Sequence, residues 1–172
     1  MTKRTFCIIG VLVILFISLA AFSVSKIFSI PEKTHYHAGF VVFENNKKID
    51  FSDNKYMYIK PCLTNANEEK ETKETIQIEK AHLHDNVGDI VHIERKGAVW
   101  GDLFTNIKFP IDYSKAVAYI NGKVVPNFKS QPIKAYESLV LFIGDNDKSL
   151  LSQAVTKEYI ENQEAKGGSC SD

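Results

Sequence analysis

The chain has 172 residues, 44% of them hydrophobic, and its 21 basic residues equal its 21 acidic ones in number. This length and composition are typical of one globular domain with an additional segment. Several of the basic residues lie near the N-terminus, and no acidic residue precedes Glu32, so the remainder is mildly acidic and has no basic block. Nucleic acid is therefore excluded as an expected partner.

The additional segment lies at the N-terminus. Lys3 and Arg4 precede an uncharged, strongly apolar run over residues 5–25. A helix of about 20 such residues matches the hydrocarbon thickness of a bilayer. We therefore expect residues 1–28 to form a single-pass anchor in the cell membrane. The positive charges favour a cytoplasmic N-terminus, which would make residues 29–172 an extracytoplasmic domain.

The anchor and the cysteines each have an alternative interpretation. Small residues at Ser18-Leu19-Ala20 and Ala21-Phe22-Ser23 allow a cleaved signal peptide, which would make the protein secreted. Outside this segment the cysteines are Cys62 and Cys170, and the chain has no Cys-x-x-Cys pair. In an oxidising compartment these two can form one disulfide, or they remain unpaired thiols.

The first element after the anchor is an expected β-hairpin that carries two histidines. The run from His35 to Phe43 reads as a strand, and Asn45-Asn46 after it is a turn signal because asparagine tolerates left-handed backbone. Residues two apart on a strand share a face, so His35, His37 and Gly39 point the same way. Gly39 leaves room beside the histidines for another backbone or a ligand.

The next stretch is polar and has few apolar residues. We expect a short strand over residues 55–60, stopped by Pro61. Residues 66–75 are expected to be a flexible, solvated loop or a frayed helix. Ile76 and Ile78 then begin an alternation that continues into the following strand.

The stretch from Ala81 to Glu94 is typical of a second β-hairpin. A turn closed over residues 85–89 places His92 directly opposite His82. His84 shares a face with His82, because side chains two apart on a strand lie side by side. Three imidazoles are therefore expected to form one patch.

The remainder of the chain predicts a helix, a hairpin, a strand and a second helix. Apolar residues recur at helical spacing from Val99 to Ile107, which predicts a helix that packs Trp100 onto the sheet. Asn121-Gly122 between two apolar runs predicts a hairpin. Residues 138–144 are apolar enough for a central strand, and residues 147–166 predict an amphipathic C-terminal helix.

From about residue 81 the order hairpin, helix, hairpin, strand resembles the β-grasp (ubiquitin-like) arrangement. Gly167-Gly168 follows a helix and is not terminal, so the resemblance does not imply sulfur-carrier or conjugation chemistry. The expected fold class is α+β. An N-terminal transmembrane helix would precede a single, mainly antiparallel β domain that ends in a C-terminal helix.

The leading apolar segment and three short motifs also resemble a group of small exported or membrane-anchored proteins of archaea and small-genome bacteria. These motifs are His35-Tyr36-His37-Ala38-Gly39-Phe40, His82-Leu83-His84-Asp85 and Trp100-Gly101-Asp102-Leu103-Phe104. The resemblance implies an exported domain with His-x-His pairs and no particular activity. Dithiol chemistry is not expected, because it needs the Cys-x-x-Cys pair that this chain lacks.

The histidines are the candidate functional residues. Imidazole is the commonest metal ligand in proteins, and His-x-His on a strand lets two rings reach one ion from one face. Copper(II) is favoured by intrinsic affinity for an all-imidazole set, and zinc by its tolerance of different geometries. The predicted metal ligands are His35, His37, His82, His84 and His92.

Other side chains near the histidines have two interpretations each. Asp85, Asp89 and Glu94 are candidate acceptors for ring N–H groups, or simply turn residues. Met57 and Cys62 are candidate soft ligands for copper(I), or a core residue and half of the disulfide, respectively.

Three functions stay open from the sequence. The first is an anchored module that buffers, delivers or senses copper or zinc outside the membrane. The second is a metalloenzyme in which histidines hold the ion and Asp85 or Glu94 acts as base, although no spacing matches a hydrolase motif. The third is an assembly or protein-interaction domain with structural or pH-responsive histidines and a protein partner outside the membrane.

Overall fold

The computed structural model describes residues 30–59 and 71–166. From Glu32 onward these residues belong to one compact unit, Glu32–Asp172. None of the helices in the described ranges is both long enough and apolar enough to cross a bilayer. The expected anchor over residues 1–28 and the expected Cys62–Cys170 disulfide lie outside the described residues.

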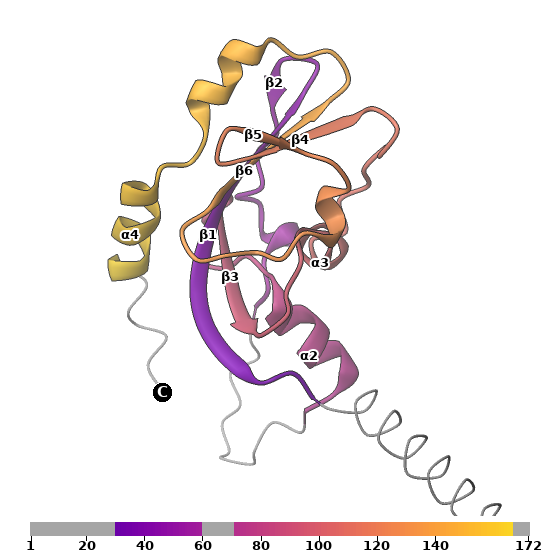
Figure 1. Ribbon diagram of the computed structural model, residues 1–172. Coiled ribbons are helices and arrows are strands. Elements are labelled where there is room, and N and C mark those ends of the chain that lie inside the picture. Colours follow the sequence, from indigo (N-terminus) through magenta and orange to yellow (C-terminus); the bar gives the residue numbers. More distant parts are fainter. Residues whose placement is uncertain (1–29, 60–70, 167–172) are drawn as a thin grey trace, which may run out of the picture. The chain divides into compact units, whose positions relative to one another are not determined.

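The fold is α+β, built on a mixed sheet that curls around its longest strand (Figure 1). In the described ranges the sheet has six strands, with the order β2-β1-β6-β4-β5 and with β3 also beside β1. The pairing of β1 with β6 is parallel and the other pairings are antiparallel. The strands are β1 (Lys33–Glu44), β2 (Lys47–Lys48), β3 (Ile90–Arg95), β4 (Ala116–Ile120), β5 (Lys123–Val125) and β6 (Ser138–Ile143).

Two hairpin turns form where their asparagines predict them. Asn45 and Asn46 have φ of 49° and 68° between β1 and β2, and Asn121 and Gly122 have φ of 49° and 77° between β4 and β5. Asparagine and glycine tolerate this left-handed backbone better than other residues. Both predicted hairpins are therefore confirmed.

The predicted helix over residues 99–107 is confirmed as α3 (Trp100–Asn106). Asp102 starts it, because its carboxylate accepts a hydrogen bond from the Val99 backbone N–H at 2.9 Å. Trp100, Leu103 and Phe104 are buried against one face of the sheet, in the main apolar core with the β1 residues Ala38, Phe40 and Val42.

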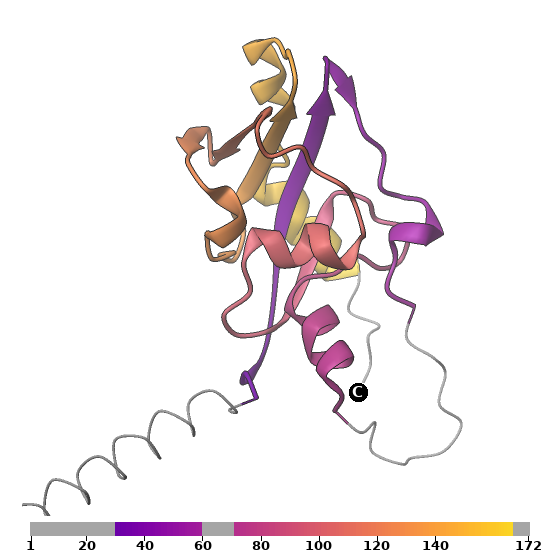
Figure 2. The same ribbon diagram turned by 90° about the vertical axis from the view of Figure 1, so that its right-hand side faces the viewer.

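The opposite face of the sheet is covered by the C-terminal segment, as the two views show (Figures 1 and 2). The helix predicted over residues 147–166 is in fact two helices, the 3₁₀ helix η3 (Lys148–Gln153) and α4 (Lys157–Lys166). Each has its own N-terminal cap: the Asp147 carboxylate accepts from Ser149 N–H, and the Thr156 hydroxyl from Tyr159 N–H. The second cap starts a new helix, which is why the predicted single helix is interrupted.

The strand predicted over residues 55–60 is wrong. Asn54–Tyr56 form the 3₁₀ helix η1, because the Asp53 side chain accepts from Lys55 N–H and caps the turn. Within the described residues of this stretch, the β pairing is a single bridge between Met57 and Leu83.

The alternation predicted at Ile76 and Ile78 is also wrong, since both belong to the helix α2 (Lys73–Lys80). Its start is fixed by a reciprocal cap between the side chains and backbones of Thr72 and Thr75. The end of the expected flexible loop at residues 73–75 is therefore helical. The capped N-terminus favours a helix, whereas the alternation of Ile76 and Ile78 is too short to specify a strand.

The hairpin predicted over residues 81–94 is wrong in its first strand. The antiparallel partner of β3 is the N-terminal half of β1, with His37 opposite His92 and Ala38 opposite Val91. The 82–83 segment adds only the isolated bridges of His82 to His92 and of Leu83 to Met57. Strand β1 is long enough to supply the backbone partners of β3. This pairing places the two His-x-His motifs on either side of β3.

The remaining described element is the short 3₁₀ helix η2 (Phe128–Ser130), which follows β5. Phe128 is buried beside Phe104 of α3, with ring centroids 6.0 Å apart.

Candidate metal centre

Backbone pairing places three histidines in a row across the sheet. His92 on β3 lies opposite His37 on β1 and, on its other side, forms the predicted bridge with His82. The bridge is closed by two backbone hydrogen bonds, of 3.1 Å from His82 N–H and 2.9 Å from His92 N–H. Directly opposite residues project to the same face, so the three imidazoles lie together.

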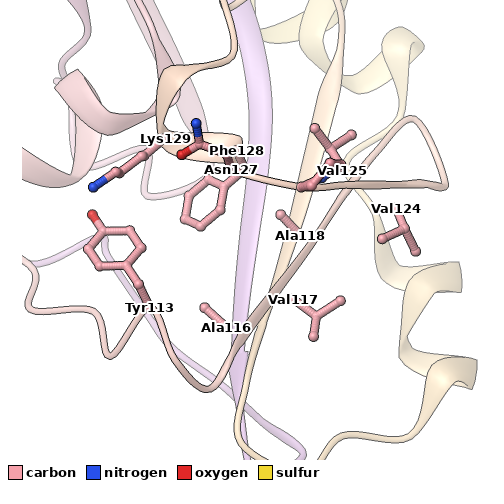
Figure 3. A pocket seen from close by; sticks show the side chains of 10 residues that line it. Tyr113, Ala116, Val117, Ala118, Val124, Val125, Asn127, Phe128 and Lys129 are labelled. Carbon is pink, nitrogen blue, oxygen red and sulfur yellow. The ribbon is translucent and has the colours of Figure 1, made fainter.

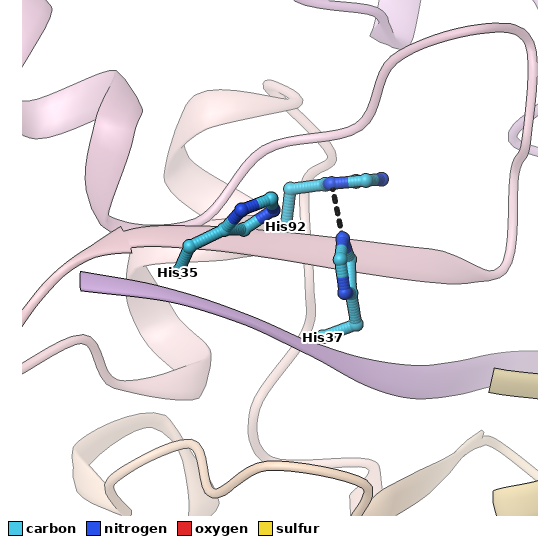
Figure 4. A group of neighbouring side chains, drawn as sticks. All are labelled: His35, His37 and His92. Atoms are coloured by element: carbon cyan, nitrogen blue, oxygen red, sulfur yellow. Dashed lines mark hydrogen bonds between the residues drawn. The ribbon is translucent and has the colours of Figure 1, made fainter. Parts of the chain in front are cut away.

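Three ring nitrogens converge on one point of this row. His37 Nε2 lies 2.7 Å from His92 Nδ1, and His84 Nε2 lies 2.8 Å from the same atom. His35, His37 and His92 each offer a nitrogen that lies within 4.8 Å of the others, which is close enough to hold a metal ion. Figure 4 shows these three side chains on the same side of β1 and β3.

The histidines differ in their access to solvent. The His37 and His92 residues are buried, the His84 side chain is 16% exposed and His35 is exposed. An ion bound among them would be shielded on the protein side and approachable from the side of His35.

Burial keeps the two central imidazoles neutral. It lowers the pKa of His92 below the ordinary histidine range, and positive charge on the surrounding histidines, His84 first, lowers it further. Burial also lowers the pKa of His37, and so does charge on His35, whereas the Glu164 carboxylate opposes the shift. Neutral imidazole is the form that binds metal ions, so the site is ready for an ion at neutral pH.

Carboxylates stand behind two of the converging rings. Asp85 Oδ2 lies 2.6 Å from His84 Nδ1, and Glu164 Oε1 of α4 lies 3.3 Å from His37 Nδ1. Asp85 has a left-handed backbone, with φ of 57°, in the turn that follows His84. Carboxylates in this position fix the ring orientation of a metal-binding histidine and raise its basicity.

The carboxylates decide which nitrogens carry hydrogen. A neutral His84 that donates Nδ1–H to Asp85 has a bare Nε2, and that lone pair faces His92 Nδ1. His37 is arranged in the same way, with Nδ1 toward Glu164 and Nε2 toward His92. A hydrogen on His92 Nδ1 can be donated to one of these two lone pairs, whereas a cation at this point can accept both.

His82 lies beside this convergence but is directed elsewhere. Its Nδ1 is 3.2 Å from the Ile78 carbonyl oxygen, so it can donate a hydrogen bond to the end of α2. Its ring stacks 5.9 Å from the His92 ring and contacts Tyr58 edge to face at 5.3 Å. The patch of His82, His84 and His92 predicted from the sequence is therefore present, but His82 stands at its edge.

The other predicted side chains lie as follows. Asp89 Oδ1 accepts from the Tyr159 hydroxyl at 3.3 Å, and Glu94 lines an open hollow of about 220 Å³ together with His35. Met57 packs against the main core, which favours its interpretation as a core residue over a copper ligand. Cys62 lies outside the described residues.

Glu164 was not among the residues predicted from the sequence. It lies four residues after Ile160, a fully buried residue of α4. Residues four apart on a helix share a face, so this spacing already indicated that Glu164 points toward the sheet. What it would meet there depended on how α4 crosses the sheet.

A second hollow, of about 320 Å³, lies at the opposite end of the sheet (Figure 3). It is lined by β4, β5 and η2, and its side chains are mostly aliphatic and aromatic. Tyr113, Val117 and Val124 at its rim are exposed. It brings together no set of metal ligands or acid–base groups comparable with the histidines.

No family model, no curated protein and no solved structure matches this chain.

Proposed function

We propose that this protein binds a copper or zinc ion with its clustered histidines and buffers, delivers or senses that ion. The observation that carries the proposal is the convergence of His37 Nε2 and His84 Nε2 on His92 Nδ1, at 2.7 and 2.8 Å. His35 supplies a further nitrogen at the open side.

A metal ion explains this arrangement better than hydrogen bonds alone. One proton on His92 Nδ1 can serve only one of the two facing nitrogens well, because hydrogen bonds weaken steeply away from linearity. Protonation of His92 is opposed by burial, which lowers its pKa. A metal ion accepts all these lone pairs at once, so it leaves none of them without a partner in a buried site.

Distances favour a small first-row ion. A tetrahedral zinc ion, with bonds of about 2.0–2.1 Å, holds nitrogens about 3.3 Å apart, and a square-planar copper(II) ion holds neighbouring nitrogens about 2.9 Å apart. The nitrogens of His35, His37 and His92 lie within 4.8 Å of one another, so rotation of these side chains brings them to the spacing of either ion. The ligand set is all imidazole, which suits both metals.

Exposure supports exchange of the ion in preference to catalysis. His35 is exposed and lines the hollow that also contains Glu94 and Glu79, so an ion can arrive from solvent past carboxylates. Of the two hollows described above, neither forms an enclosed substrate cavity beside the histidines. Buffering or delivery requires access to the ion, which this arrangement supplies.

The wider setting is also part of the proposal. Residues 1–28 would anchor the protein in the membrane, with the metal site outside, and the protein would belong with the small exported His-x-His proteins that its motifs resemble. The order of β1 and β3, α3, β4 and β5, then β6 supports a β-grasp-like fold in which β1 supplies the first strand.

The test is metal content measured by mass spectrometry on the full chain, purified in detergent after exposure to zinc or to copper(II). We expect about one ion per wild-type chain and almost none after His92→Ala, because that substitution removes the nitrogen on which the others converge. Bound ion should also raise the unfolding free energy by about 2.7 kcal/mol at a free concentration 100 times Kd.

His82→Ala is the matched control. It removes a buried histidine of the same row whose Nδ1 is directed to Ile78, so metal content should stay near the wild-type level. Circular dichroism of each variant establishes that it is folded. A wild-type chain without metal, or equal metal content in wild type and His92→Ala, would contradict the proposal.

A further inference from the structure

We infer that Glu164 is a positioning residue of the metal site, and that the ion and the C-terminal helix α4 therefore stabilise each other. The inference rests on the proposed function, since it concerns the same ion. Beyond the proposed ligands, the metal site would then include Glu164 and helix α4, which are remote from the histidines in the sequence.

Glu164 lies between two partners at the end of α4. Its Oε2 accepts a hydrogen bond of 2.8 Å from the Tyr136 hydroxyl, which fixes the carboxylate. Its other oxygen, Oε1, faces His37 Nδ1 at 3.3 Å. The carboxylate is thus held by one side chain and directed at a second.

His37 Nδ1 is the atom that needs this carboxylate. It is buried, and among the described residues it has no hydrogen-bond partner of good geometry, because the 3.3 Å contact with Glu164 is poorly aligned. Buried polar nitrogens are almost always satisfied, so an exception calls for an explanation. A contact that becomes a hydrogen bond when the ion is bound supplies one.

An ion at His37 Nε2 strengthens that contact. A bound cation withdraws electron density from the ring, which makes Nδ1–H a better donor. Glu164 in turn makes Nε2 a more basic ligand. The pair formed by His84 and Asp85 has the same arrangement at 2.6 Å, so two of the converging rings would be oriented by carboxylates.

Helix α4 is otherwise held by few contacts. Of its residues described, Ile160 is the buried one, and Tyr159 adds a hydroxyl bond of 3.3 Å to Asp89. Most of the helix surface is exposed. A helix with so little apolar contact opens easily, so one additional charged hydrogen bond has a measurable effect on its docking.

Thermodynamic linkage makes the effect reciprocal. If docking of α4, through Glu164, raises the affinity of the site for the ion by some factor, the ion raises the docking equilibrium of α4 by the same factor. Loss of an orienting carboxylate typically lowers metal affinity about 10- to 100-fold. The same range is therefore expected for the change in local opening of α4.

The first experiment compares Glu164→Gln with Glu161→Gln in the full chain, by competition of zinc with a chromophoric chelator. Both substitutions remove one charge from α4, but Glu161 pairs with Lys157 on the exposed side of the helix. We expect Glu164→Gln to weaken zinc binding about 10- to 100-fold and Glu161→Gln to leave it within about twofold. Equal affinity of the two variants would overturn the inference.

The second experiment needs no variant. Hydrogen exchange of the wild-type chain is measured over Lys157–Lys166 without metal and with saturating zinc. We expect exchange of these amides to slow by about the same 10- to 100-fold, and that slowing to be absent in Glu164→Gln. Unchanged exchange on zinc binding in the wild type would overturn the inference.

A third readout separates positioning from a general structural role. In the zinc-loaded wild type, nitrogen NMR should show hydrogen on His37 Nδ1 in slow exchange with solvent, and Glu164→Gln should speed that exchange. An unprotonated His37 Nδ1 in the zinc-loaded protein would overturn the inference. If the wild-type chain binds no metal at all, the proposed function fails as well, so the two failures are distinguishable.

Discussion

The two halves of β1 present the same face to very different surroundings. In the C-terminal half, Val41 and Phe43 pack with Phe142 and with Leu150 and Leu151 of η3 in a cluster of aliphatic and aromatic side chains. In the N-terminal half, the face carries His35 and His37 and is covered by α4, whose Glu164 approaches His37. The C-terminal half of β1 therefore belongs to the apolar core, and the N-terminal half belongs to the candidate metal centre.

The difference concerns how each half is stabilised. Apolar side chains gain free energy when they leave water and need no further partner. Buried imidazoles lose hydration and must recover it from hydrogen bonds or from an ion. The apolar half should therefore maintain the fold by itself, whereas the histidine half should depend on what it binds.

The largest expected effect comes from breaking the apolar half. Phe43 is 1% exposed and packs edge to face with Phe142 at 5.8 Å, so Phe43→Ala should lower the free energy of unfolding by about 3–5 kcal/mol. Urea denaturation of the metal-free protein measures this. The metal content of the molecules that remain folded should be unchanged.

Val117→Ala is the control, because Val117 is 44% exposed on β4 and should change stability by less than about 0.5 kcal/mol. A Phe43→Ala protein as stable as this control would show that the apolar half is not what holds the sheet together.

An intermediate effect is expected at the boundary between the halves. A Cβ at Gly39 would lie 2.5 Å from Val155 Cβ, which belongs to the short link between η3 and α4. Gly39→Ala should therefore displace this link and lower the free energy of unfolding by about 1–3 kcal/mol. Thermal unfolding and zinc affinity are the measurements, and both should fall because α4 follows Val155.

The double variant Gly39→Ala, Val155→Gly tests the mechanism, since it removes both Val155 atoms that clash, Cβ and Cγ1. It should be more stable than the sum of the two single changes indicates. If the two changes are strictly additive, Val155 is not the residue that requires a glycine at position 39.

The smallest expected effect concerns pH. Burial lowers the pKa of His92 in the folded protein, whereas the unfolded chain titrates near 6.5. Below about pH 6.5, His92 therefore binds a proton in the unfolded chain but not in the folded chain. The free energy of unfolding falls as the pH falls. Between pH 6.5 and 5.5 the loss should be about 1 kcal/mol for this histidine, measured by urea denaturation in chelator.

His92→Leu isolates this contribution, because it replaces the imidazole by a side chain that does not titrate. Its stability should vary less over the same pH range than that of the wild type. The groups that face His92 are His37, His82, His84 and His35, and all remain in the variant. An unchanged pH dependence would assign the effect to other groups.

The parts of the fold that were predictable from sequence are set by neighbours along the chain. The turns at Asn45-Asn46 and Asn121-Gly122 and the helix α3 depend on local backbone preference and on a clear apolar period. Helix α2, which was not predicted, depends on a Thr72–Thr75 cap, and the alternation of Ile76 and Ile78 concealed this signal in the sequence. The pairing of β3 with β1 joins segments far apart in the chain, and no local pattern specifies it.

The same distinction holds for the site. That His82 and His92 face each other followed from the length of one turn, and the structure contains this bridge. That His84 joins them was also expected, because it shares a face with His82. The approach of His37 to His92 required the pairing of β1 with β3, which no local pattern predicted. The approach of Glu164 required the path of the last helix, which is fixed by the fit of Val155 against Gly39.

The separation of these histidines along the chain has a consequence for how the protein loses its fold. An ion gripped by His37 and His84 acts as a reversible cross-link between points about 47 residues apart, and such a link removes entropy from the unfolded chain. Depletion of the ion would therefore loosen the polypeptide as well as empty the site. The lifetime of the protein against proteolysis would then follow the supply of metal around it.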